Sequence, residues 1–92
     1  MSDDPIKRRM ARAKQRAIDD LGALGYDVIS SDNRPICLVA MLGKDVRIIK
    51  ICLDSASPEE KQRVSQYSAS SVASRELWIR KSGRERFEIQ KV

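Results

Sequence analysis

The sequence predicts an α+β fold built from two helices and five strands. Near the N-terminus, apolar residues recur every three or four positions, as they do along one face of a helix. Further along, two long apolar runs at 36–42 and 46–53 flank a tight turn at Gly43-Lys44-Asp45. Strands that are apolar on both faces are covered on both sides. A second helix and two alternating strands follow, which gives the order helix, three strands, helix, two strands.

Composition limits the classes of function. The 92 residues suffice for one domain, 1–92, and carry 18 Lys and Arg against 13 Asp and Glu. The net charge of +5 suits an anionic partner, nucleic acid above all, or else a solvated basic surface. The absence of His removes Ser-His and Cys-His catalysis. Without a long apolar run or an apolar signal core, we expect a cytoplasmic protein with reduced thiols, no membrane span and no small-molecule substrate.

The first helix is predicted from Asp3 or Asp4 as the N-cap and Pro5 in the first turn, with Gly25 as its end. Its apolar stripe consists of Ile6, Met10, Ala13, Ala17, Leu21 and Leu24. The other faces of its first turns are cationic. These cations either contact phosphate or form a solvated face, since like charges on a helix cost about 0.2–0.5 kcal/mol per pair. They are Lys7, Arg8, Arg9, Arg12, Lys14 and Arg16.

A short strand at 26–30 and a polar loop at 31–35 lead into the central hairpin. Ser57, Pro58 and Glu60 form the pattern of a capping box and start the second helix, which has little apolar surface to bury. Strands at 75–81 and 84–92 follow, joined by a predicted hairpin turn at Ser82-Gly83.

In these last strands, alternation places Leu77 and Ile79 on one face, with Phe87 and Ile89 as their expected cross-strand partners. Trp78 falls on the opposite face among charges. There it either stacks on a base or partner, or packs against Arg and Lys stems.

This order of elements resembles the PD-(D/E)XK nuclease superfamily, in particular small archaeal Holliday-junction-resolvase-like proteins and related phage nuclease-like proteins. The resemblance covers nearly the whole chain and implies an αβββαββ restriction-endonuclease-like core, with a mixed central sheet flanked by two helices. The resemblance rests on four sequence segments: Leu24-Gly25-Tyr26-Asp27-Val28, Arg34-Pro35-Ile36-Cys37-Leu38-Val39-Ala40, Val46-Arg47-Ile48-Ile49-Lys50-Ile51-Cys52 and Arg75-Glu76-Leu77-Trp78-Ile79-Arg80.

The resemblance also implies a catalytic motif, and this chain departs from it. Such nucleases carry an Asp on the second strand and a Glu-x-Lys triplet on the third, and the two carboxylates hold Mg²⁺. Here those positions are Cys37, Lys50 and Cys52. A cation repels Mg²⁺ and a thiol is a poor ligand for it, so we expect a catalytically degenerate site without a cofactor.

Two questions about this site stay open. Relocated metal ligands would make the chain an active Mg²⁺-dependent endonuclease, and the candidates are Asp32, Asp45, Asp54, Glu59 and Glu60. If the central strands pair, Cys37 and Cys52 share one face with Lys50. They are then either a thiolate activated by Lys50 or small buried hydrophobes in an abandoned pocket.

The expected function is therefore binding of DNA through its phosphates, or assembly with a nucleic-acid-processing partner. The expected contacts are Lys7, Arg8, Arg9, Arg12, Arg16, Arg34 and Lys50. Two alternatives remain: the endonuclease or Holliday junction resolvase with relocated ligands, and a structural or dimerising module without a nucleic-acid role. The resemblance is also compatible with a homodimer.

Overall fold

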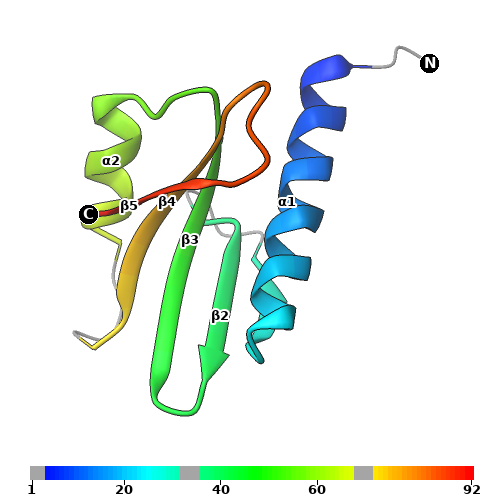
Figure 1. Ribbon diagram of the computed structural model, residues 1–92. Coiled ribbons are helices and arrows are strands. Elements are labelled where there is room, and N and C mark those ends of the chain that lie inside the picture. The colour runs from blue at the N-terminus through cyan, green and yellow to red at the C-terminus, as the bar shows by residue number, and fades with distance from the viewer. Residues whose placement is uncertain (1–3, 32–35, 68–71) are drawn as a thin grey trace.

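A computed structural model describes residues 4–31, 36–67 and 72–92. Its strands form one mixed sheet in the order β1-β2-β3-β4-β5, in which β3 and β4 are parallel and the other neighbours are antiparallel. The predicted α+β class and αβββαββ order are confirmed (Figure 1). The elements are α1 (Pro5–Ala23), β1 (Asp27–Ser30), β2 (Leu38–Leu42), β3 (Asp45–Leu53), α2 (Pro58–Ser65), β4 (Ser74–Arg80) and β5 (Glu88–Lys91).

The central hairpin forms as predicted. β2 and β3 pair through a two-residue turn in which Leu42 lies opposite Asp45 and Gly43 has a φ of 59°. A glycine at this turn position is needed because side chains disfavour positive φ. β3 lies in the middle of the sheet, and its apolar residues are buried on both faces. The largely apolar sequence of β3, in which Arg47 and Lys50 are charged, is thus explained by its central place.

The two helices cover opposite faces of the sheet (Figure 1). On one face, Ala13, Ala17 and Leu21 of α1 pack against a cluster formed by Leu38, Ala40, Ile49, Ile51 and Trp78. On the other face, Val64 is the buried residue of α2 and packs against Ile36, Ile48, Cys52, Ala73, Leu77 and Ile79. α2 is short and contributes one fully buried side chain, in line with the small apolar surface that its sequence offers.

The ends of α1 confirm its predicted caps. The Asp4 carboxylate accepts a hydrogen bond from the Ile6 N–H at 3.0 Å. Gly25 follows the helix with a φ of 94°, and the Tyr26 N–H donates to the Leu21 carbonyl at 3.1 Å, as in a Schellman motif. The middle of the predicted apolar stripe is buried against the sheet. Ile6 and Leu24, at the two ends of the helix, extend past the strands and are exposed.

The last two strands differ from the prediction. The turn at Ser82-Gly83 exists, with Gly83 at a φ of 78° and the Arg84 N–H donating to the Lys81 carbonyl at 3.2 Å. Strand pairing does not resume directly after this turn, and β5 begins only at Glu88. Residues 81–87 instead form a loop, which we call the β4–β5 loop. The Arg80 guanidinium holds it by donating to the Glu85 carbonyl.

The register of β5 also corrects the expected side-chain pairs. Ile89 lies opposite Trp78, and Leu77 and Ile79 lie opposite Gln90 and Glu88. Trp78 is 3% exposed and faces α1, with the Arg47 guanidinium 5.2 Å from its ring centre. Of the two sequence interpretations, packing against an arginine is the one observed. The delayed start of β5 shifts the register and so changes every partner.

Candidate nucleic-acid interface

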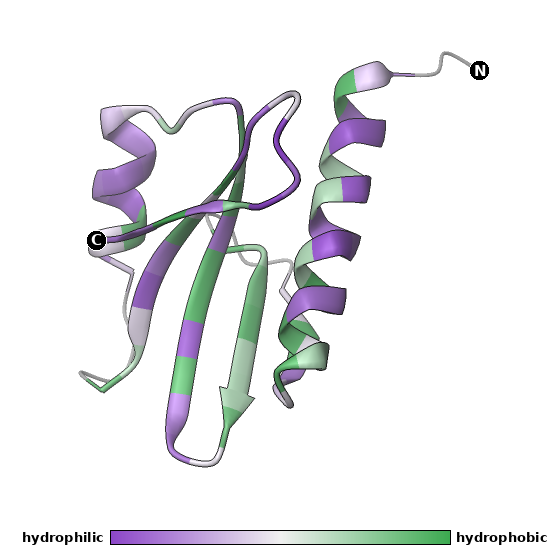
Figure 2. Ribbon diagram, in the orientation of Figure 1, coloured by the Kyte–Doolittle hydropathy of each residue, from purple (hydrophilic) through white to green (hydrophobic). Residues whose placement is uncertain are grey.

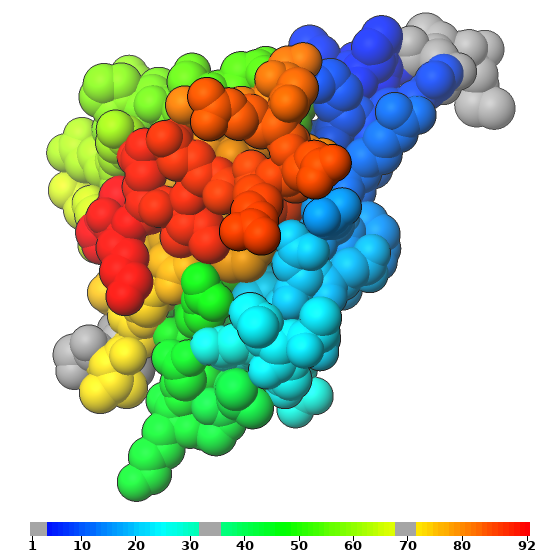
Figure 3. Space-filling view, in the orientation of Figure 1, coloured from blue at the N-terminus to red at the C-terminus, as the bar shows by residue number. Residues whose placement is uncertain are grey.

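A basic cleft of about 450 Å³ lies between α1 and the β4–β5 loop. Its apolar lining comes from Ala13 and Leu53, and Glu85 is the acidic residue among the described residues that line it. In the space-filling view, the loop borders the N-terminal half of α1 (Figure 3). The loop and the outer face of α1 are both strongly hydrophilic (Figure 2). Six cations line the cleft: Arg9, Arg12, Arg16, Arg80, Lys81 and Arg84.

Helical geometry places three of these cations together. Arg9, Arg12 and Arg16 follow one another at spacings of three and four, so they form a single stripe along α1. This stripe lies beside the buried Ala13 and Ala17, which fix how α1 sits on the sheet. The other three cations come from the end of β4 and the loop after it. Opposite walls of the cleft are therefore cationic, although they are about seventy residues apart in the sequence.

Some of these cations already have partners. Arg16 pairs with Asp20 at 3.1 Å, and Lys81 pairs with Glu88 at 3.4 Å. Arg80 lies 5.7 Å from the Phe87 ring centre. Within residues 4–31, 36–67 and 72–92, neither Arg12 nor Arg84 is paired with a carboxylate. These two arginines are available to an anion without breaking an ion pair of the described structure.

Asp54 joins the two walls at the edge of the cleft. Its carboxylate accepts two hydrogen bonds from the Arg9 guanidinium, at 3.0 and 3.1 Å. These bonds lower the pKa of Asp54, and the backbone of Ser82 hydrogen-bonds to the same carboxyl. Asp54 has a φ of 68°, a conformation in which Asn and Asp are favoured over other side chains. This forked contact is the one that an arginine also makes with a phosphate.

The structure brings together only some of the predicted DNA contacts. Arg9, Arg12 and Arg16 line the cleft, whereas Lys7 and Arg8 are exposed on α1 outside its lining. Lys50 lies on the α2 face of the sheet, since its neighbours Ile49 and Ile51 face α1. Arg34 lies outside the described residues. Sequence reasoning missed Arg80, Lys81 and Arg84, because the predicted hairpin placed them in regular strands.

The structure places Lys50 and Cys52 of the degenerate motif on the α2 face of the sheet, and Cys37 lies near them, just before β2. Cys52 belongs to the cluster under α2, whereas Cys37 packs against the cluster under α1. The Cys37 N–H donates to the Ile49 carbonyl at 2.9 Å, although Leu38 is the strand partner of Ile49. The expectation that both thiols share one face with Lys50 is confirmed for Cys52, which lies with Lys50 on the α2 face, whereas Cys37 contacts the α1 cluster. The two thiols are still near enough for Cys37 to raise the pKa of Cys52.

The environment of Cys52 also excludes an activated thiolate at that position. Burial raises the pKa of its thiol to about 12, and the hydrogen bond to Glu60, at 3.1 Å, acts in the same direction. The charge of Lys50 lowers this pKa, but not enough to compensate. Cys52 is thus a protonated, buried thiol at neutral pH, as in the second interpretation of the cysteine pair.

The candidate metal ligands are dispersed. Asp45 accepts a hydrogen bond from Tyr26, Asp54 binds Arg9, and Glu60 accepts the Cys52 thiol. Glu59 is exposed in the first turn of α2, and Asp32 lies outside the described residues. In the part of the chain that the structure describes, no three His, Cys, Asp or Glu residues are placed to hold a metal ion.

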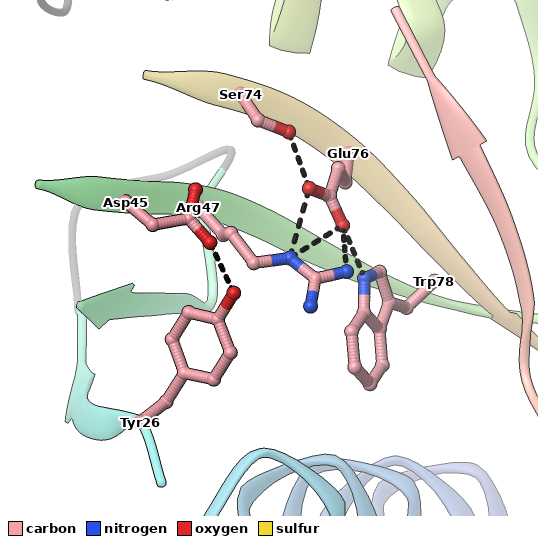
Figure 4. A network of polar contacts seen from close by, with 6 residues as sticks. All are labelled: Tyr26, Asp45, Arg47, Ser74, Glu76 and Trp78. Carbon is pink, nitrogen blue, oxygen red and sulfur yellow. Dashed lines mark hydrogen bonds and ion pairs between the residues drawn. The ribbon is translucent and has the colours of Figure 1, made fainter. Parts of the chain in front are cut away.

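A second polar cluster lies under α1 (Figure 4). Arg47 of β3 pairs with Glu76 of β4, with Nη2 2.6 Å from Oε1 and Nε 2.9 Å from Oε2. Ser74 and the Trp78 Nε1, the latter at 3.0 Å, also donate to Glu76, which is 1% exposed. The Arg47 guanidinium lies 5.5 Å from the Tyr26 ring centre and 5.2 Å from that of Trp78.

Glu76 keeps its charge in this cluster. Burial acts to raise its pKa, but the hydrogen bonds from Arg47, Ser74 and Trp78 outweigh burial and lower it. No described buried side-chain nitrogen or oxygen in the protein lacks a hydrogen-bond partner. With its groups satisfied by one another, the cluster is a structural element of the core.

A scan against protein-family models finds no match, and a search of curated proteins finds none either. Among the described helices, none combines the length and apolar character needed to cross a membrane.

Proposed function

We propose that this protein binds nucleic acid, mainly DNA, through the sugar-phosphate backbone at the basic cleft. The observation that carries the proposal is the lining of the cleft, with six cations on two facing walls and one carboxylate, Glu85. Arginine forks match phosphate geometry, and neutralising phosphates drives binding that does not depend on sequence.

The arrangement of the cations supports this proposal over a merely solvated basic surface. A cationic face on an isolated helix spreads its charges outward into water at little cost. Here Arg12 on α1 and Arg84 on the loop line the same cleft, so their fields add within it. Neither charge is ion-paired within the described residues, and a polyanion between the walls would neutralise both.

We further propose that the fold is a catalytically degenerate relative of the PD-(D/E)XK nucleases. The support is the αβββαββ order together with Cys37, Lys50 and Cys52 at the motif positions. A domain of this kind would hold DNA without cutting it. Cleavage of plain or branched DNA on addition of Mg²⁺ would favour the endonuclease alternative instead.

Fluorescence anisotropy with a labelled DNA oligonucleotide tests the proposal. We expect micromolar or tighter binding at about 20 mM salt, and weakening as salt rises, with a log–log slope of about −3 to −5 for three to six phosphate contacts. An oligonucleotide with an uncharged methylphosphonate backbone is the control and should not bind. Absence of binding to the charged oligonucleotide at low salt would contradict the proposal.

A variant of Asp54 is predicted to strengthen DNA binding. Asn is tolerated at positive φ, and its amide oxygen still accepts a hydrogen bond from Arg9, so Asp54→Asn keeps the local geometry while removing one negative charge at the cleft. We expect DNA affinity to rise about fivefold at low salt, with a smaller gain at high salt because the charges are screened. Asp19→Asn, an exposed change on α1 away from the cleft lining, is the control. Unchanged or weaker binding by Asp54→Asn would show that Arg9 does not contact the ligand.

A further inference from the structure

A second hollow, of about 410 Å³, adjoins the basic cleft. The two share Lys81, Arg84 and Glu85 in their linings, so they meet along the β4–β5 loop. The second hollow adds Arg86, Phe87 and Glu88. Phe87 is the aromatic residue among the described residues that line the two hollows.

The two hollows differ in chemistry. The first has six cations and one carboxylate in its lining. The second has three cations and two carboxylates, and Lys81 is paired with Glu88 at 3.4 Å. A phosphate is therefore favoured in the first hollow, whereas a nearly neutral hollow with an aromatic wall suits a flat, uncharged ring such as a nucleobase.

The Phe87 ring is held in place. Its centre lies 5.3 Å from that of Trp78, with an interplanar angle of 52°, and the Arg80 guanidinium lies 5.7 Å away. Trp78 is itself fixed by its hydrogen bond to Glu76 at 3.0 Å. A half-buried ring with fixed neighbours loses little conformational freedom when a base packs against it.

We propose that the joined hollows bind a single strand of nucleic acid, with its backbone between α1 and the β4–β5 loop and a base against Phe87. This inference rests on the function proposed above and narrows it. Each hollow has the volume of a small-molecule site, enough for one or two nucleotides of a strand. Bases paired within a duplex are also stacked on one another and cannot reach Phe87.

Three probes test this inference at one salt concentration: a twelve-nucleotide single strand, the same strand in a duplex, and a strand of equal length with abasic sites in place of its bases. The abasic strand keeps the phosphates and removes the rings. We expect the intact strand to bind about tenfold more tightly than either of the others, because contact of one base with an aromatic residue contributes about this factor.

Phe87→Leu tests the base contact itself. Leucine keeps an apolar side chain against Trp78, and we expect about tenfold weaker binding of the intact strand with no change for the abasic strand or the duplex. Ile89→Ala is the matched control, since Ile89 is exposed on β5 outside both hollow linings. The abasic comparison uses the unaltered protein, so it stands even if the Phe87 variant folds poorly.

The outcomes separate this inference from the proposed function. Equal or tighter binding of the duplex, together with no discrimination between the intact and the abasic strand, would overturn the single-strand inference and leave backbone binding intact. Failure of all three probes to bind at low salt would overturn both.

Discussion

Reversing two charges on opposite walls of the cleft, as Arg12→Glu with Arg84→Glu, is expected to weaken DNA binding about a hundredfold at low salt. Each reversal removes a cation from phosphate contact and adds an anion that repels the backbone. Neither arginine is ion-paired within the described residues, so the fold should be retained. Anisotropy titrations measure the affinity, and circular dichroism with thermal unfolding checks the structure.

The matched control reverses two lysines elsewhere. Lys44 lies in the β2–β3 turn and Lys61 lies on α2, and both are exposed and outside the cleft. Lys44→Glu with Lys61→Glu changes the net charge by the same amount, so it reports the effect of overall charge alone. We expect less than a tenfold loss from this control. Equal losses from the two double variants would mean that the cleft has no special role.

Glu76→Gln is expected to lower the free energy of unfolding by about 3 kcal/mol, because it leaves the Arg47 charge beneath α1 without its partner. Gln keeps the volume and one acceptor oxygen but cannot carry the bonds from Arg47, Ser74 and Trp78 together. Urea unfolding measures the change. Glu59→Gln, at an exposed position of α2, is the control and should cost less than about 1 kcal/mol.

The Arg47–Glu76 ion pair also predicts that the stability of the protein depends on pH. The folded-state pKa of Glu76 is lowered, so its contribution to stability is fully present above the pKa of an unfolded glutamate, about 4.3. The contribution is lost as pH falls below this value and through the lowered folded pKa. The difference in stability between the natural protein and Glu76→Gln should therefore shrink from about pH 4.5 downward. A difference that stays constant to pH 3 would show that Glu76 does not titrate in this way.

The sequence predicted the parts of the fold in which local signals and burial agree. Asp4, Pro5 and Gly25 mark the ends of α1 through their own backbone chemistry, and the apolar run of β3 requires a central place in the sheet. The β4–β5 connection escaped prediction because alternation at 84–92 fits a strand equally well. Contacts of Arg80 with the Glu85 carbonyl and the Phe87 ring hold a loop there instead, and such contacts have no signature in the sequence.

The candidate site likewise depends on contacts between distant residues that the sequence does not reveal. The stripe of Arg9, Arg12 and Arg16 could be predicted from helical spacing, but its facing wall depends on where the β4–β5 loop lies. The Arg47–Glu76 pair also escaped prediction, because it joins two parallel strands whose register the sequence does not reveal. A slightly displaced hydrogen bond at Cys37 is likewise invisible in the sequence, yet it marks where the regular pairing of β2 with β3 ends.

The salt dependence of DNA binding by Arg12→Gln with Arg84→Gln tests the central claim most directly. If both arginines neutralise phosphates in the cleft, the log–log slope becomes shallower than that of the natural protein by about 1.4 to 1.8, the sum for two lost contacts. A slope equal to that of the natural protein, whatever the change in affinity, would contradict the claim that the two facing walls hold a nucleic-acid backbone.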